Sequence, residues 1–149
     1  MEKKTQYNIN RLLEEGLIRK IPQSKNKAAE SIRTAESWLK EASNNLSSNA
    51  LRSCIISSYL AMFHSARSIL FADGFREKSH FAVARYLEDQ YANKDKLETK
   101  WIVLLDHFRE TRHDDQYSTT FFVTEDDAES ALQSAREFIR RMKELAKEK

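Results

Sequence analysis

The stretch ALRSCIISSYLAMFHSARSILFAD, from Ala50 to Asp73, decides the fold. Its apolar side chains cover most of the circumference of a helix; they are Ile55, Ile56, Tyr59, Leu60, Met62, Phe63, Ile69 and Leu70. A helix that is apolar nearly all round is packed by several neighbours or by a second subunit. We therefore predict a central helix over 50–73, ended by Gly74, with other helices around it.

The composition favours a small number of long helices around this central one. The 149 residues fit one domain, with 40% apolar and 32% charged residues. The chain has two Gly and one Pro, whereas an average protein of this length has roughly ten and about seven. That shortage argues against sandwiches, barrels and α/β folds, which need many tight turns. The composition therefore predicts an all-α protein.

Start and stop signals divide the rest of the chain into further helices. Gly16 is placed to end a short helix over about 6–15, and Ser24 and Ser79 are placed to cap two others. The expected later helices run from Ser79 to a break at Asn93, over 97–114 and over 124–147. The connection 115–123 includes 118–123, which has strand propensity but no visible partner strand.

The last helix has the strongest signals. It opens with Thr124 followed by three acidic residues, the third at the capping-box position. Its apolar stripe is Ala128, Ala131, Leu132, Ala135, Phe138, Ile139, Met142 and Leu145. We predict an up-and-down bundle of four to five main helices plus a short N-terminal helix, in one domain over 1–149. Residues 1–22 form the N-terminal helix and linker, and 24–147 form the bundle.

Several classes of protein are excluded by simple counts. The single Cys54 lies in an apolar run, which predicts a buried core thiol and no internal disulfide. The first twenty residues show no signal peptide, and no stretch approaches ~18 apolar residues. We therefore expect a cytoplasmic protein that does not contact a membrane. The net charge of +2 is too small to demand nucleic acid as a partner.

Two arginines occupy helix positions that the pattern reserves for apolar side chains. Arg112 continues the stripe of Leu105 and Phe108, and Arg67 lies four residues after Phe63 in the most apolar helix. A buried guanidinium keeps its charge and needs a carboxylate, a phosphate or carbonyls. Each arginine either lies at the edge of the core, pairing with a carboxylate such as Asp114, or lines a groove that holds a phosphate.

Three histidines lie near these arginines or near a helix start. His64 is one turn before Arg67, His113 follows Arg112, and His80 follows the cap Ser79, where anions bind well. Each is either structural or able to move a proton near neutral pH while arginines hold a phosphate. A metal site of His113, Asp114, Asp115 and His107 is disfavoured, because these side chains point in different directions on a helix. We expect no metal and no cofactor.

At this point the sequence resembles the HEPN family, which is named for nucleotide binding in higher eukaryotes and prokaryotes. The resemblance covers about Asn10 to Leu145 and is closest to small stand-alone archaeal and bacterial members. The segments that carry it are 35–39 (AESWL), 59–67 (YLAMFHSAR), 78–80 (KSH), 112–117 (RHDDQY) and the final helix from Thr124.

The resemblance implies a helical bundle that is commonly a homodimer, with the motif near the dimer groove. Many members are ribonucleases that need no metal, and others are toxins or partners of small nucleotidyltransferases. The ribonuclease motif is Arg, a polar residue, three or more variable positions, then His. Arg112 and His113 match its start, and Tyr117 stands where His would be. A tyrosine there is either structural or a modifiable hydroxyl, since some family toxins are switched off by nucleotide addition to a nearby tyrosine.

Three functional hypotheses follow. The first is a dimeric module that binds a nucleotide or RNA phosphate beside a nucleotidyltransferase, in a toxin–antitoxin type of system. Its catalytic candidates are Arg112, His113 and Tyr117, and its binding candidates are His64, Arg67, Ser79 and His80. The second is an endoribonuclease toxin with His113 as acid or base. The third is a non-catalytic interaction protein whose arginines close a dimer.

Overall fold

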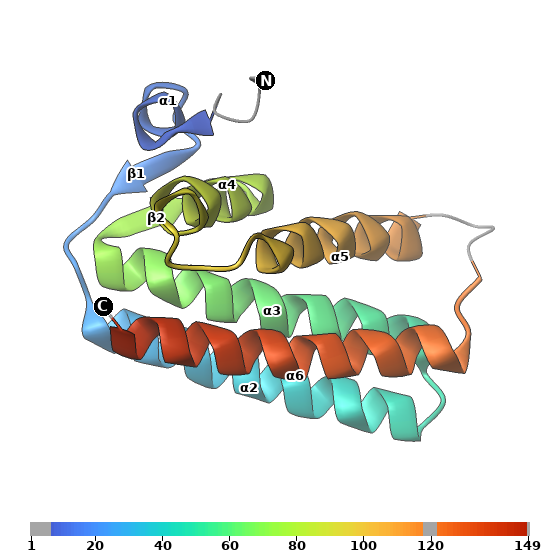
Figure 1. Ribbon diagram of the computed structural model, residues 1–149. Coiled ribbons are helices and arrows are strands. Elements are labelled where there is room, and N and C mark those ends of the chain that lie inside the picture. Colours follow the sequence, from blue (N-terminus) through green and yellow to red (C-terminus); the bar gives the residue numbers. More distant parts are fainter. Residues whose placement is uncertain (1–6, 118–121, 149) are drawn as a thin grey trace.

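The computed structural model describes residues 7–117 and 122–148, without the side chain of Asp115 (Figure 1). It is an all-α bundle with one short two-stranded ribbon, as the sequence predicts apart from the ribbon. The elements are α1 (Ile9–Glu14), β1 (Ile18–Lys20), α2 (Lys25–Ser47), α3 (Leu51–Asp73), β2 (Phe75–Glu77), α4 (His80–Gln90), the 3-10 turn η2 (Ala92–Lys94), α5 (Thr99–Tyr117) and α6 (Glu125–Glu148).

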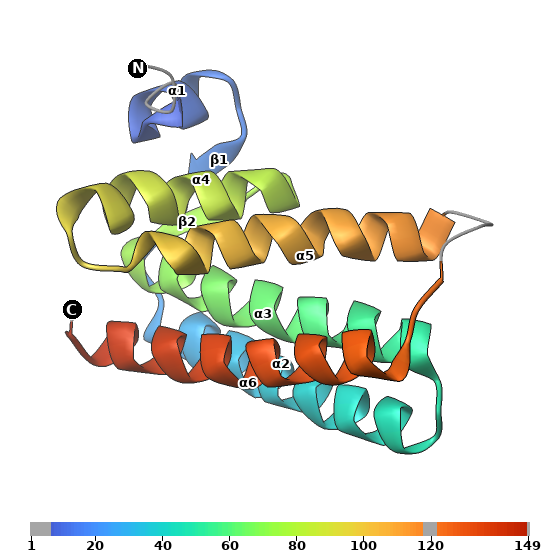
Figure 2. The same cartoon turned by 45° about the vertical axis from the view of Figure 1, so that its right-hand side comes forward.

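Helix α3 is the centre of the bundle. Helices α2 and α6 pack along one side of it, while α4 and α5 lie on the opposite side (Figures 1 and 2). Its apolar residues are buried, with Tyr59 1% exposed and Met62, Ile69 and Leu70 fully covered. The prediction of a central helix is therefore confirmed, and the neighbours that surround it come from this chain.

Among the described residues, α3 alone is long and apolar enough to cross a membrane by length and composition. Its most apolar window is 78% buried inside the bundle. That burial is typical of the core helix of a bundle.

Four serines of α3 are buried together with its apolar residues: Ser57, Ser58, Ser65 and Ser68. Ser57, Ser65 and Ser68 donate hydrogen bonds to carbonyls one turn earlier in α3, at 2.6–2.8 Å. Ser31 of α2 donates to the carbonyl of His64 at 2.7 Å. A buried hydroxyl is costly unless it is hydrogen-bonded, and these bonds allow α3 to be covered on every side.

The predicted helix starts at Ser24, Ser79 and Thr124 are confirmed. Ser24 and Ser79 accept hydrogen bonds from the backbone at Lys27 and Ala82. Thr124 and Asp127 form the capping box, each side chain accepting from the other residue's backbone N–H at 3.1 Å. All eight residues predicted for the stripe of α6 are buried.

Helix α5 extends further than the sequence indicates. It continues through residues 115–117 instead of ending near Asp114. Two contacts one turn apart favour the extension: Arg112 donates to Gln116 at 2.7 Å, and the rings of His113 and Tyr117 lie 4.9 Å apart. Of the stretch 118–123, for which we predicted strand propensity, residues 118–121 lie outside the described residues.

The β1–β2 ribbon was not predicted. It pairs Ile18 with Glu77, Arg19 with Arg76 and Lys20 with Phe75 in antiparallel register. A three-residue strand is too short to show a recognisable alternation of apolar and polar residues. The two strands are also far apart in the sequence, because β1 precedes α2 and β2 follows α3. The ribbon holds α1 against the end of the bundle where α3 meets α4 (Figure 2).

The two glycines give a matched test of the packing at the end of α3. Both have positive φ, +71° at Gly16 and +92° at Gly74. A Cβ would meet nothing within 4 Å at Gly16, but at Gly74 it would lie 3.0 Å from the carbonyl oxygen of Ile21. We expect Gly16→Ala to lower the free energy of unfolding by about 1–2 kcal/mol through backbone strain alone. Gly74→Ala should cost at least about 1 kcal/mol more because of the clash.

Urea unfolding followed by circular dichroism measures both variants under the same conditions. Equal losses for the two would show that the chain around Ile21 moves aside, and that its contact with Gly74 is not tight.

Candidate functional site

A tyrosine of α3 and a histidine at the start of α4 form the centre of the site. The Tyr59 hydroxyl lies 2.8 Å from Nδ1 of His80. The His80 ring stacks on the ring of Phe63, with centroids 3.9 Å apart and planes within 10°. Ser79 caps α4 directly before His80, so the cap, the stack and the hydrogen bond together fix this imidazole.

Arg112 reaches the same aromatic rings from α5. Its guanidinium carbon lies 5.2 Å from the centre of the Tyr59 ring, within range of a cation–π interaction. Its Nη1 donates to Gln116, and its buried Nε has no hydrogen-bond partner. Among the described carboxylates none forms an ion pair with Arg112, and the alternative of a pair with Asp114 is not seen.

Arg67 lies on the other side of Phe63. Its guanidinium carbon is 5.7 Å from the Phe63 ring and 5.0 Å from the Phe71 ring. Its Nε binds the carboxylate of Glu77 at 3.1 Å, and the two side chains are 17% and 8% exposed. The two arginines therefore contact neighbouring aromatic rings, and of these two only Arg67 has a carboxylate partner among the described side chains. We call the group Tyr59, Phe63, His64, Arg67, His80 and Arg112 the His80 site.

The two histidines of the His80 site are uncharged at neutral pH. Burial lowers the pKa of His80 to about 4, and the charges of Arg112, Arg67 and Arg109 lower it in the same direction. Burial and the charge of Arg67 likewise lower the pKa of His64 to about 4. Since arginine keeps its proton, the positive charge of the site comes from the guanidinium groups alone.

The hydrogen bond from Tyr59 determines which nitrogen of His80 carries the proton. Burial raises the pKa of the Tyr59 phenol, so its O–H stays protonated and needs an acceptor. Nδ1 of His80 supplies that acceptor, which places the ring proton on Nε2. His80 then offers an N–H donor at neutral pH and no free lone pair to take up a proton.

A second group of charges lies beside the His80 site and was missed from the sequence. The Phe81 ring lies between Arg85 and Arg109, whose guanidinium carbons are 5.0 and 5.4 Å from its centre. Asp106 binds Arg85 at 2.6 Å and Arg109 at 3.4 Å. Asp106 and Arg109 are one helix turn apart, so the sequence could have predicted the ion pair between them. These pairs neutralise the neighbouring arginines, whereas Arg112 has no carboxylate partner among the side chains that the structure describes.

The other candidates from the sequence lie outside this cluster. His113 and Tyr117 are exposed at the end of α5, and Tyr117 is 68% exposed. Their two rings contact each other. In the described part of the chain no group of three or more His, Cys, Asp or Glu could hold a metal ion. The structure thus joins Arg112 to Arg67, His64, Ser79 and His80, and separates it from His113 and Tyr117.

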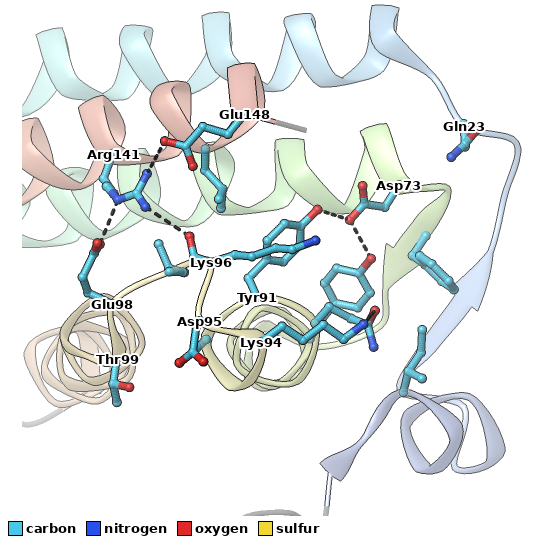
Figure 3. Close-up of a pocket in the computed structure, with 17 residues that line it drawn as sticks. Gln23, Asp73, Tyr91, Lys94, Asp95, Lys96, Glu98, Thr99, Arg141 and Glu148 are labelled. Atoms are coloured by element: carbon cyan, nitrogen blue, oxygen red, sulfur yellow. Dashed lines mark hydrogen bonds and ion pairs between the residues drawn. The ribbon is translucent and has the colours of Figure 1, made fainter.

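A pocket of about 1130 Å³ lies at the opposite end of α5, against the C-terminal part of α6 (Figure 3). Its polar groups already bind one another. The hydroxyls of Tyr86 and Tyr91 both donate to Asp73 at 2.7 Å, and Arg141 binds Glu98 at 2.8 Å. These bonds tie α4 to α3 and the start of α5 to α6, so the pocket's polar groups have a structural role.

Together the fold and the His80 site define an all-α module with a positively charged, histidine-containing surface between three helices. The family model of the HEPN domain matches residues 28–145, and the chain belongs to this family. The match includes every residue of the His80 site, whereas α1 and β1 precede it. No curated protein matched the chain.

The buried histidines predict a pH dependence of stability. Between pH 6.5, the ordinary pKa of histidine, and about pH 4, the unfolded chain binds protons at His64 and His80 while the folded chain does not. Their contribution to the free energy of unfolding is therefore fully present above pH 6.5 and is lost as the pH falls toward 4. We expect the difference between wild type and His64→Gln/His80→Gln to be constant above pH 6.5 and to shrink below it.

Urea unfolding at a series of pH values measures this difference, and other titrating groups cancel in the comparison. A difference that stays constant from pH 7 to pH 4 would show that these imidazoles are not held neutral by the fold.

Proposed function

We propose that this HEPN domain binds the phosphate of a nucleotide or of RNA at the His80 site. The observation that carries the proposal is Arg112, a guanidinium that lies over Tyr59 beside His80 and has no carboxylate partner among the described residues. A half-buried guanidinium without an anion is costly, and a phosphate supplies the missing oxygen acceptors.

The groups around Arg112 suit an anion. Its guanidinium presents several N–H donors in one plane, which matches phosphate oxygens. His80 adds an Nε2–H donor without adding charge, and the start of α4 contributes the positive end of a helix dipole. Glu77 and Asp106 are acids close to the site, and both carboxylates are already bound to arginines, Glu77 to Arg67 and Asp106 to Arg85.

The same geometry favours binding over RNA cleavage. A general base needs a free lone pair, and the hydrogen bond from Tyr59 leaves His80 with its proton on Nε2. His113, the other candidate, is exposed on α5 and contacts Tyr117 instead of the His80 site. Tyr117 stands at the position of the motif histidine, and a phenol is a poor proton acceptor near neutral pH.

We further propose that the module acts as a homodimer beside a nucleotidyltransferase, in a system of the toxin–antitoxin type, as its likeness to small HEPN proteins implies. Two large exposed apolar residues support a protein partner at the C-terminal end of α5. Tyr117 is the last residue of α5 and is 68% exposed, and Phe122 is 90% exposed. Exposed apolar residues that lie together favour contact with another protein surface.

Replacing the unpaired arginine should weaken phosphate binding. We expect Arg112→Ala to bind adenosine monophosphate and oligouridylate about tenfold or more weakly, since a charge-assisted hydrogen bond contributes about 1.5–3 kcal/mol. Arg140→Ala is the matched control, because Arg140 is an exposed arginine on α6. Calorimetry or fluorescence anisotropy at fixed salt measures both variants, with helicity checked by circular dichroism.

Equal binding by wild type and Arg112→Ala, or no binding by either, would refute the proposal. Incubation of single-stranded RNA with the wild type and a chelator tests the ribonuclease alternative, which requires cleavage. If Arg112→Ala instead loses dimerisation with no effect on ligand, Arg112 closes an interface and the protein is an interaction module.

Tyr117 is the tyrosine most open to a modifying partner. Tyr59, Tyr86 and Tyr91 are 1%, 2% and 7% exposed, against 68% for Tyr117. On co-expression with a nucleotidyltransferase from the neighbouring gene, we expect the Tyr117 hydroxyl to accept a nucleotidyl group from a nucleoside triphosphate, with release of pyrophosphate. The intact mass should rise by one nucleotidyl group in the wild type and in Tyr7→Phe, but not in Tyr117→Phe. An unchanged wild-type mass would count against this partner.

A further inference from the structure

The β1–β2 ribbon places two arginines opposite each other. Arg19 of β1 and Arg76 of β2 are directly paired in the register, so their side chains lie on the same face of the ribbon. Like charges in this arrangement destabilise a strand pair. The two charges therefore do not stabilise the folded chain. An anion bound between the two guanidinium groups would remove their repulsion.

The surroundings of the ribbon do not neutralise these charges. A hollow of about 720 Å³ lies along it, lined by Leu13, Gly16, Ile18, Arg19, Lys20, Arg76, Glu77 and Lys78. Glu77 is the one acid in this lining, and its carboxylate binds Arg67 and is only 8% exposed. Within the described parts of the chain, none of the four lining cations takes part in an ion pair.

The ribbon is continuous with the His80 site. The guanidinium carbons of Arg76 and Arg67 both lie close to the Phe71 ring, at 5.8 and 5.0 Å from its centre. Glu77, the last residue of β2, binds Arg67, and His80 begins α4 shortly after it. Cationic side chains thus extend from Arg112 through Arg67 to the ribbon, which lies beside α4 in both views (Figures 1 and 2).

We propose that the ribbon is a second phosphate-binding surface, and that the ligand of this protein is a single-stranded nucleic acid and not a mononucleotide. One phosphate occupies the His80 site, and neighbouring phosphates of the same strand lie on Arg19, Arg76, Lys20 and Lys78. This inference rests on the proposed function of the His80 site. Successive cations whose one neighbouring acid, Glu77, is already bound to Arg67 suit the regularly spaced charges of a phosphodiester backbone.

The test neutralises the facing pair in the full chain. Arg19→Gln/Arg76→Gln should weaken binding of a fluorescent oligouridylate at low salt and leave binding of adenosine monophosphate unchanged. The plot of log K against log salt for the oligomer should become less steep by about 1.4, because two contacts to a single strand are removed. The control is Lys40→Gln/Arg140→Gln, which removes two exposed charges from α2 and α6 and should keep the wild-type slope.

The outcomes separate this inference from the proposed function. If the wild type binds adenosine monophosphate as tightly as oligouridylate, or if the ribbon variant keeps the wild-type slope, the ribbon proposal is overturned and the His80 site stands. If the wild type binds neither ligand, the proposed function fails as well. Polyglutamate bound as tightly as oligouridylate would overturn the assignment to a phosphodiester chain.

Misfolding cannot imitate the expected result. Removal of two facing like charges should leave the midpoint of urea unfolding equal to that of the wild type or above it. A ribbon variant with a lower midpoint would show that the two arginines stabilise the fold, which contradicts the proposal directly.

Discussion

The burial of α3 on all sides is the constraint on which the rest of the structure depends. A helix in that position cannot leave polar groups to water, and most of its hydroxyls are satisfied by its own carbonyls, as at Ser65 and Ser68. The phenol of Tyr59 is too long to do this, and it takes Nδ1 of His80 at the start of α4. This hydrogen bond joins α4 to α3, together with those from Tyr86 and Tyr91 to Asp73, and it fixes an imidazole at the surface of the bundle.

The distribution of charge around this imidazole defines the chemistry of the site. Acids pair with the arginines on both sides, Glu77 with Arg67 and Asp106 with Arg85. Arg112 lies over an aromatic ring with an amide as its hydrogen-bond partner. Burial and the surrounding guanidinium groups keep the pKa of His80 near 4, so the histidine adds a donor and no charge. The arrangement suits recognition of an anion more than transfer of a proton.

The family match and the ribbon concern different parts of the chain. The HEPN match covers residues 28–145 and includes α2 to most of α6, whereas β1 lies before it. The ribbon joins that preceding segment to the end of α3, next to Arg67 and Glu77. Half of the ribbon therefore comes from outside the matched region.

The sequence by itself determined the helices, their caps and the core. Periodic apolar stripes of α3 and α6 and the signals at Ser24, Ser79 and Thr124 are local, so they were correct before any contact was known. The placement of Arg67 and Arg112 toward the interior also followed from helix periodicity. Only the tertiary structure decided which of them binds a described carboxylate, that Tyr59 binds His80, and that Arg19 faces Arg76. These pairs join residues far apart in the chain, and no local pattern encodes which distant side chain lies within hydrogen-bond distance.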